Sequence, residues 1–285
     1  MSSVLFDVPG PRARTRQRIG TVLVAALLVG IGYVVVRRLT EEQFTVENLD
    51  ELFQPGNFEA IGEGLLGTVQ AAAIAIVTSV LFGLVFAAMR LADNRLVGAV
   101  AWTVVEFFRA VPLLMLILII FYSPVKDVME DVGVPGDLGS LVLGLTLYNG
   151  AVLAEVFRAG VNAVPTGQAE AAYAVGMRKG QVLRLIQVPQ AVRIMLPAII
   201  SQCVVILKDT SLGYVIIYDE LLSQANNIGD FIGANLLTYV CIALIYVSIN
   251  YSLSRVATWL EARTTRAARS SAQRVEGATG ALTGG

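Results

Sequence analysis

Histidine is absent from the 285 residues of the sequence, and cysteine occurs only twice, at Cys203 and Cys241. Histidine is the commonest zinc ligand and the usual general base near neutral pH, so its absence argues against zinc enzymes and Ser-His hydrolases. Neither a GxxxxGK[ST] phosphate loop nor a GxSxG nucleophile elbow occurs. Both cysteines lie in apolar stretches, where a thiol packs as a small hydrophobe. We therefore expect no catalytic residue, no metal site and no cofactor bound by this chain.

Charge is also scarce. Only 15% of the residues are charged and 55% are hydrophobic, with a mean hydropathy of +0.68. Soluble domains carry roughly 25% charged residues, so this chain has too little polar surface to cover a water-exposed globule. The net charge of −1 says less than the placement of the charges. The composition predicts an integral membrane protein.

Six stretches approach the length of about 20 mostly apolar residues that crosses a bilayer. They are Ile19–Val36, Leu65–Met89, Leu96–Tyr122, Leu138–Phe157, Ile194–Ile217 and Phe231–Leu253. The first lacks a small-residue cleavage site, so we interpret it as an uncleaved anchor and not a signal peptide. Pro112 and Pro197 should kink the third and fifth stretches, because proline removes a backbone hydrogen bond. We expect an all-α membrane protein with six transmembrane helices.

The basic residues indicate the orientation. With the N-terminus in the cytoplasm and six spans, the cytoplasmic segments hold Arg12, Arg14, Arg16, Arg18, Arg90, Arg95, Arg158, Arg178, Lys179, Arg184, Arg193, Arg255, Arg263, Arg266, Arg269 and Arg274. Only Arg37, Arg38 and Lys126 fall clearly outside, together with most of the acids. This is the positive-inside pattern, and it predicts that both termini lie in the cytoplasm.

The largest of these cytoplasmic loops contains the segment 166–189. Its residues 170–189 read EAAYAVGMRKGQVLRLIQVP. Thr166 can cap a helix that the following alanines propagate. Gly176 can end it, since glycine tolerates the left-handed conformation just past a helix. A second short helix should follow, closed by Pro189. The pattern predicts a helix–bend–helix elbow, which could be a handle for another protein or only a surface loop that folds.

The spacing of this elbow resembles the EAA loop of ABC importer permeases. Glu170-Ala171-Ala172 is followed by Gly176, then Ile186, then Val188-Pro189 where the family usually has Leu-Pro. VEFFRAVPLL, YNGAVLAEVFRAGVNAVPTGQAEAA and LPAIISQCVVILKDTSL are similar to matching segments of polar amino-acid permeases (the histidine, glutamine and glutamate family). VLFDVPGPR and GLTLYNG further resemble D-type permease subunits of bacterial glutamate importers. The likeness covers about residues 60 to 258.

This resemblance implies a type I ABC permease fold, in which one N-terminal helix precedes a five-helix core. Residues 1–18 would form a basic cytoplasmic N-terminus, 19–36 the extra helix, 37–60 an external segment, 61–258 the core and 259–285 a cytoplasmic tail that we expect to be disordered. The chain would be a multi-pass subunit of the bacterial cytoplasmic membrane. It would take up a polar amino acid, glutamate first or else glutamine or aspartate, without catalysis of its own.

The resemblance also implies the partners. ATP and Mg²⁺ would be bound by a cytoplasmic ABC ATPase dimer. This dimer would bind the elbow at Glu170, Ala171, Ala172, Gly176, Arg178, Ile186 and Pro189. A second permease, a paralogue or a copy, would complete the pathway, and an extracytoplasmic amino-acid-binding protein would deliver the solute. Lipid surrounds the chain and no nucleic acid is involved.

Several ionisable residues fall inside the apolar stretches, where a charge at the centre of a span costs roughly 2.5–3.5 kcal/mol on insertion scales. Glu106 and Arg109 are three residues apart, as are Glu155 and Arg158, so each pair shares a helix face. Each pair can neutralise itself within the bundle. Alternatively, these charges line a cavity for a zwitterionic solute.

An amino acid needs partners for its carboxylate and its ammonium group. Arginine suits a carboxylate because its planar fork binds both oxygens, and Lys208 could meet a second anion. Hydroxyl or amide groups could contribute, or could only satisfy backbone carbonyls and hydrogen-bond between helices. The substrate-pathway candidates are Glu106, Arg109, Asn149, Glu155, Arg158, Lys208, Asp209, Thr210 and Ser211. A secondary transporter or channel for a small polar solute is the alternative function, for which no ATPase would be needed.

Overall fold

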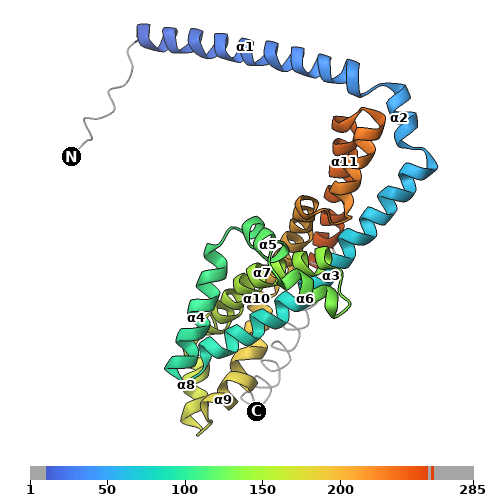
Figure 1. The fold of residues 1–285 in the computed structure, drawn as a ribbon. Coiled ribbons are helices and arrows are strands. Elements are labelled where there is room, and N and C mark those ends of the chain that lie inside the picture. The colour runs from blue at the N-terminus through green and yellow to red at the C-terminus, as the bar shows by residue number, and fades with distance from the viewer. Residues whose placement is uncertain (1–10, 256–257, 260–285) are drawn as a thin grey trace, which may run out of the picture.

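A computed structural model describes residues 11–255 and 258–259, and every regular element in this part of the chain is helical (Figure 1). The first elements are α1 (Pro11–Gln43), α2 (Val46–Leu52), α3 (Pro55–Leu91), α4 (Arg95–Ala110), α5 (Leu113–Phe121), α6 (Val125–Asp131) and α7 (Gly136–Asn162). They are followed by α8 (Thr166–Ala174), α9 (Lys179–Gln181), the π-helix η1 (Val182–Gln187), α10 (Val188–Asp209), the 3₁₀ helix η2 (Thr210–Ile216) and α11 (Leu221–Ile232). A C-terminal helix, Asn235–Arg255, completes the bundle.

The most extensive contact in the fold joins α3 to α7. The side of α3 that faces the protein carries small residues four positions apart, at Ala71, Ala75, Ser79, Gly83 and Ala87, and all of them are buried. Residues at i and i+4 lie on one face of a helix, so these positions form a continuous narrow ridge. Small residues let two membrane helices approach closely. This ridge therefore explains why α3 and α7 pack along their lengths.

Helix α7 is the centre of the bundle. Over its most apolar stretch 61% of the residues are buried, the largest share of any candidate span. Helices α4, α5 and α10 pack on it as well as α3. Leu141 and Leu145 of α7 join Ile117 of α5 and Ile206 of α10 in one core cluster. Nearer the elbow, Leu153 and Phe157 of α7 pack in a second cluster with Met195 of α10.

The third predicted span is not one straight helix. Helices α4 and α5 meet at 97° across Val111 and Pro112, so the apolar stretch is a broken span or a re-entrant loop. Val111 adopts an extended conformation, with ψ of 129°, because the ring of the following proline disfavours the helical region. The predicted kink at Pro112 is confirmed. Among the residues that the structure describes, five helices are long and apolar enough to cross a membrane, or six if the bent pair counts as one span.

The fifth predicted span is longer than expected and begins in the elbow. Helix runs without interruption from Lys179 to Ile216, over 38 residues. The prediction that Pro189 separates a short elbow helix from the next span is wrong. Proline at this position would clash with the carbonyl of Leu185 in a regular α-helix, and the turn before it is widened into the π-helix η1. The helix also continues through Pro197.

The other bounds shift by smaller amounts. Helix α3 begins ten residues before the predicted Leu65, and α7 extends the predicted fourth span at both ends. The predicted sixth span started at Phe231, but the chain turns at Gly233, with φ of 70°, between α11 and the C-terminal helix. Residues 1–10 and the predicted tail from 260 onward lie outside the described residues.

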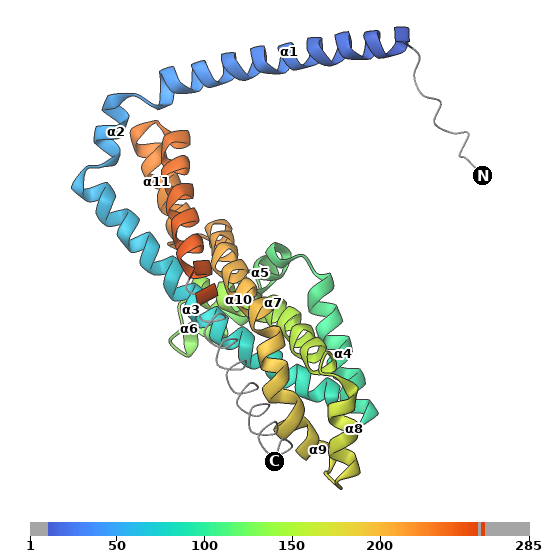
Figure 2. The same ribbon diagram turned by 180° about the vertical axis from the view of Figure 1, so that it is seen from behind.

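Helix α1 contains the predicted N-terminal span and projects away from the bundle (Figures 1 and 2). Within its most apolar stretch no residue is buried. The chain contacts the bundle where α1 ends, because the Leu236 backbone N–H donates to Gln43 Oε1 at 3.3 Å. Leu52 of α2 then packs with Ile228 and Leu237. The external segment of the sequence analysis thus contains a short packed helix.

The α3–α7 contact can be tested at a single glycine. A Cβ on Gly83 would lie 2.9 Å from the Leu153 Cβ and 3.1 Å from the Ala154 backbone nitrogen, so α7 would have to move. We expect Gly83→Ala to destabilise the chain by about 1–3 kcal/mol and to lower its thermal unfolding midpoint. Gly62→Ala, on the same helix with nothing within 4 Å, is the matched control and should be neutral or slightly stabilising. Equal midpoints for the two variants would contradict this packing.

Candidate functional site

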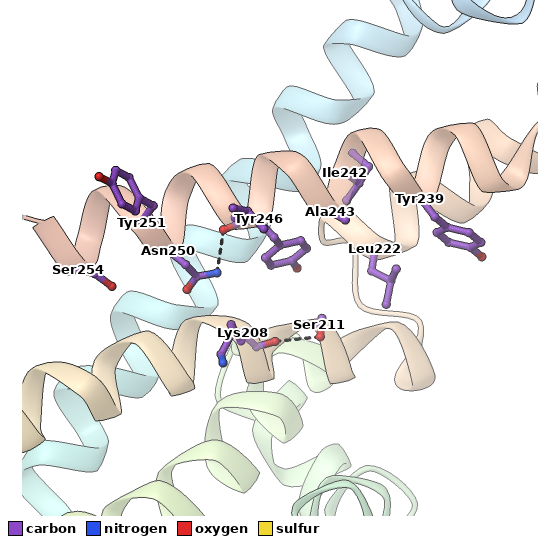
Figure 3. Close-up of a pocket in the computed structure, with 11 residues that line it drawn as sticks. Lys208, Ser211, Leu222, Tyr239, Ile242, Ala243, Tyr246, Asn250, Tyr251 and Ser254 are labelled. Atoms are coloured by element: carbon purple, nitrogen blue, oxygen red, sulfur yellow. Dashed lines mark hydrogen bonds between the residues drawn. The ribbon is translucent and has the colours of Figure 1, made fainter. Parts of the chain in front are cut away.

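A groove of about 780 Å³ lies between the end of α10 and the C-terminal helix (Figure 3). Its lining mixes apolar, aromatic and polar side chains: Lys208, Ser211, Leu222, Tyr239, Ile242, Ala243, Tyr246, Val247, Asn250, Tyr251 and Ser254. Cavities of roughly 300–1,000 Å³ with a few polar groups among apolar ones are typical of small-molecule sites. An amino acid fits this size and this mixture.

Lys208 is the cation of the groove. Its side chain is exposed there and forms no salt bridge with a carboxylate of the described residues. An ammonium group on a flexible stem acts as a point charge with three donors and suits a carboxylate or another small anion. Of the charged residues predicted for the pathway, only Lys208 lines this groove.

Asn250 contributes an acceptor on the opposite wall. Its Nδ2 donates to the Tyr246 carbonyl at 2.8 Å. Its Oδ1 is buried and has no hydrogen-bond partner among the described residues. An unpaired buried carbonyl costs free energy until a donor reaches it. Lys208 and Asn250 line the same groove from the two helices that border it (Figure 3). The groove thus presents a cation and a free acceptor, which are the two groups that a zwitterion requires.

The two hydroxyls predicted beside Lys208 serve the backbone. Thr210 is buried and donates to the Leu207 carbonyl at 2.7 Å, while Ser211 donates to the Lys208 carbonyl at 2.8 Å. Here α10 changes into the 3₁₀ helix η2, which leaves carbonyls without regular helical partners. The structure therefore supports the backbone alternative for both residues. Ser211 still lines the groove, whereas Thr210 lies below its surface.

Asn149 and Asp209 lie away from the groove. Asn149 of α7 is fully buried, and its Oδ1 accepts from Gln202 Nε2 of α10 at 2.6 Å. The Asn149 Nδ2 has no hydrogen-bond partner among the described residues, and Asp209, the last residue of α10, does not line the groove. A second polar bridge, between the Thr78 and Thr146 hydroxyls at 2.6 Å, joins α3 to α7. These contacts are the helix–helix hydrogen bonds that the sequence analysis offered as the alternative for Asn149.

The two predicted ion pairs both form, but neither lines the groove. Arg109 Nη1 lies 3.0 Å from Glu106 Oε1 in the last two turns of α4, and both side chains are partly exposed. Glu155 pairs with Arg158 on α7 and also with Arg90 of α3, whose Nη1 lies 2.5 Å from Glu155 Oε2. The self-neutralising interpretation is confirmed for Glu106 and Arg109, whereas Glu155 is shared by two arginines. Arg90 was missed as a partner because it is 65 residues distant from Glu155 in the sequence.

A buried acid that the sequence analysis missed fixes one wall of the groove. Glu220 is fully buried at the start of α11, where its Oε1 accepts from the Ser223 backbone N–H at 2.8 Å. Its Oε2 accepts from the Tyr246 hydroxyl at 2.6 Å. Burial raises the pKa of the Glu220 carboxyl, and the hydrogen bonds offset only part of this shift. Glu220 is the N-cap and Ser223 lies three residues later, which is the reverse of the usual capping box with Ser or Thr first, so no local sequence pattern indicated this acid.

The predicted elbow is present at the opposite end of the bundle (Figure 1). Helix α8 ends in a Schellman motif: the Met177 N–H donates to the Ala172 carbonyl at 3.1 Å and the Gly176 N–H to the Tyr173 carbonyl at 2.9 Å. Gly176 has φ of +84°, a conformation that glycine adopts at no steric cost. The predicted bend is confirmed. Helix α8 begins at Thr166 with Pro165 as its N-cap, so the expected capping bond from Thr166 is absent.

The elbow residues differ in exposure. Glu170, Ala171, Arg178 and Pro189 are exposed, Ile186 is half-buried and Ala172 is buried. Helix α8 packs against η1, so the two arms form one compact unit. Lys179 pairs with Asp93 in the turn between α3 and α4. The elbow thus exposes a mixed outer face, on which the charged Glu170 and Arg178 lie beside the apolar Val175 and Leu185, while Ala172 is buried.

Comparison with known proteins supports one family. Residues 79–266 match the family of binding-protein-dependent transport system inner membrane components. The chain is 35% identical over 209 residues to the glutamate transport system permease protein GluD of Corynebacterium glutamicum, which covers 72% of this chain and 75% of that protein. It is 35% identical over 207 residues to the probable glutamine ABC transporter permease protein GlnP of Bacillus subtilis, covering 71% and 93%.

A solved structure of an ABC transporter agrees with this family match. The crystal structure of an amino acid ABC transporter with histidines matches with a TM-score of 0.69 at 29% identity, and the match covers 77% of this chain and 99% of that chain. The matched family region, residues 79–266, contains the elbow and nearly every residue that lines the groove or packs around α7.

The bond between Glu220 and Tyr246 should be measurable. Tyr246→Phe removes the hydroxyl donor and leaves one oxygen of a fully buried carboxyl unpaired, so we expect a loss of about 1–3 kcal/mol in the free energy of unfolding. Tyr251→Phe is the control, because Tyr251 lies on the same helix and is 64% exposed. Thermal unfolding of both purified variants in the same detergent makes the comparison, and no difference between them would contradict the role of the bond.

Proposed function

The chain belongs to the family of binding-protein-dependent transport system inner membrane components, and we propose that it takes up a polar amino acid, with glutamate preferred over glutamine or aspartate. It is the membrane-spanning permease subunit of an ABC importer. The identity of 35% to a glutamate permease, over 72% of this chain, is the observation that carries the proposal. The groove supports it, because Lys208 offers a cation for a carboxylate and Asn250 an acceptor for an ammonium group.

The assembly proposed for this chain divides the work among subunits. A cytoplasmic ABC ATPase dimer binds ATP and Mg²⁺ and supplies the energy, while an extracytoplasmic binding protein delivers the amino acid. A second permease, a paralogue or a copy, encloses the pathway from the other side. This chain performs no chemical step. Its residues form the groove and the elbow, and its contribution is to bind, orient and release the solute.

The orientation proposed for the chain places both termini and the elbow in the cytoplasm, with α2 and the end of α11 outside. The asymmetry of Lys and Arg supports this arrangement, since Arg90, Arg95, Arg158, Lys179 and Arg193 lie at or near the elbow end of the bundle. The exposed outer face of the elbow would then meet the ATPase. The inner bacterial membrane is the proposed location.

One helix connects the elbow to the groove. The uninterrupted stretch from Lys179 to Ile216 begins in the second arm of the elbow and carries Lys208 near its other end. At about 1.5 Å per residue, the 29 positions from Lys179 to Lys208 span roughly 44 Å. When the ATPase closes and the elbow moves, this helix would move the Lys208 wall of the groove relative to the C-terminal helix. Alternating access follows from that displacement.

The coupling role of the elbow can be tested at Gly176. Gly176→Pro forbids the positive φ and removes the N–H that bonds Tyr173, so the two arms should lose their fixed angle. We expect the variant to reach the membrane but to lose ATP-driven uptake while the assembled transporter still hydrolyses ATP. Glu170→Lys, which reverses a charge on the outer face, should have the same effect.

Gly180→Ala is the matched control for this experiment, because Gly180 has no positive φ and a Cβ there would meet nothing within 4 Å. Its uptake should equal that of the unmodified chain. Normal coupled uptake by both Gly176→Pro and Glu170→Lys would overturn the proposed role of the elbow.

The role of Lys208 can be tested separately. Lys208→Met preserves the length of the side chain and removes its charge, so we expect the half-saturating glutamate concentration for uptake to rise about tenfold or more. Lys126→Met, which removes a lysine outside the groove, serves as the control. An effect of Lys208→Met on protein abundance alone would indicate a purely structural role for Lys208.

A further inference from the structure

A second cavity, of about 420 Å³, lies at the elbow end of the bundle, away from the groove. It is formed by the end of α3, the end of α7 and the second arm of the elbow. Its lining residues are Arg90, Leu91, Ala92, Arg158, Val161, Asn162, Tyr173, Lys179, Leu183 and Gln187. Three of these residues carry a positive charge, and none of them is a carboxylate. The groove proposed for the solute shares no residue with it.

The two arginines of this cavity share one carboxylate. Arg90 Nη1 lies 2.5 Å from Glu155 Oε2, and Arg158 donates through Nε at 3.1 Å and also through Nη2 to the same group. Both oxygens of Glu155 are therefore occupied. The remaining guanidinium donors, Nε and Nη2 of Arg90 and Nη1 of Arg158, make no hydrogen bond with the described residues.

One positive charge is consequently left over at a partly buried position. The Arg90 side chain is only 11% exposed, and that of Arg158 is 32% exposed. A charge withdrawn from water is unfavourable unless an opposite charge or several hydrogen bonds compensate it. Arg90 lies in the last turn of α3, whose dipole is favourable for a cation, but this partial charge is much weaker than a full negative charge. A counter-anion would complete the site.

Lys179 adds a third cation at the rim. It pairs with Asp93, whose side chain is 80% exposed, so water competes with that pair and the ammonium group can turn toward another anion. The amides of Asn162 and Gln187 and the hydroxyl of Tyr173 supply neutral donors around the same space. Planar guanidinium groups with additional donors are the arrangement that binds phosphate through several hydrogen bonds.

We propose that this cavity binds a phosphate group, with Arg90, Arg158 and Lys179 as its cationic ligands. An acidic phospholipid is the source that the position favours. The cavity lies at the ends of the membrane-spanning helices α3 and α7, and Leu91, Val161 and Leu183 add an apolar side to it. Basic pockets between helices on the cytoplasmic side of a membrane are suited to anionic headgroups. A headgroup here would bridge α3 and α7 to the second arm of the elbow.

The test uses the full chain in nanodiscs of phosphatidylcholine, either alone or with phosphatidylglycerol, and measures the apparent dissociation constant of phosphatidylglycerol by native mass spectrometry. Arg90→Gln leaves the Glu155–Arg158 pair in place, and Lys179→Gln changes only the rim. We expect each to weaken phosphatidylglycerol binding about tenfold or more, since each removes charge-assisted hydrogen bonds. Arg193→Gln, an exposed arginine of α10 outside the cavity, is the control and should bind as the unmodified chain does.

A second experiment distinguishes between a phospholipid and free phosphate as the source of the phosphate group. Inorganic phosphate is added to the chain in phosphatidylcholine alone, and its thermal unfolding midpoint is measured. A rise that Arg90→Gln abolishes would support the site with a free phosphate as its ligand. Equal phosphatidylglycerol binding by all variants, with no response to inorganic phosphate, would overturn the proposal. Lys179→Gln keeps the test valid if Arg90→Gln fails to insert.

Discussion

Two apolar helices in a membrane gain little free energy when contacts with lipid are replaced by contacts between the helices. The contact between α3 and α7 must therefore rest on close packing. The ridge Ala71, Ala75, Ser79, Gly83 and Ala87 permits that approach. Across it, the Thr78–Thr146 bond and the Arg90–Glu155 ion pair fix the two helices against sliding. Because α4, α5 and α10 also pack on α7, the positions of the groove and of the elbow both follow from this one contact.

The second constraint is continuity between Lys179 and Ile216. A membrane helix that ended at Pro189 would leave the elbow as a flexible appendage, whereas a helix that passes through it ties the elbow to the bundle. The π-helix before Pro189 makes this possible, because it removes the clash that proline would cause in a regular α-helix. At the other end the regular helix stops at Asp209, where Thr210 and Ser211 bond the exposed carbonyls. The buried pair of Glu220 and Tyr246 then holds α11 against the C-terminal helix and sets the width of the groove.

The features that depend on local sequence were predictable, and those that depend on distant partners were not. The apolar runs located the membrane helices, Gly176 located the bend of the elbow, and Pro112 located a break in the third stretch. Three-residue spacing also identified both ion pairs. By contrast, Arg90 reaches Glu155 only because α3 and α7 pack together. Pro189 was expected to end a helix, because the π-helix that relieves its clash is a backbone geometry that no residue type encodes. The i, i+4 ridge of α3 was present in the sequence, but its meaning depends on which helix it faces.

The central claim is that the helix from Lys179 to Ile216 moves as one unit and carries elbow motion to the groove. Distances between spin labels on the assembled transporter, with Cys203 and Cys241 replaced, test it directly. A label pair at Gly180→Cys and Ser201→Cys reports on the helix itself, and a pair at Ser201→Cys and Ser252→Cys reports on the separation of the two helices that border the groove. On ATP binding the account predicts an unchanged first distance and a changed second distance. A first distance that changes while the second stays constant would contradict it.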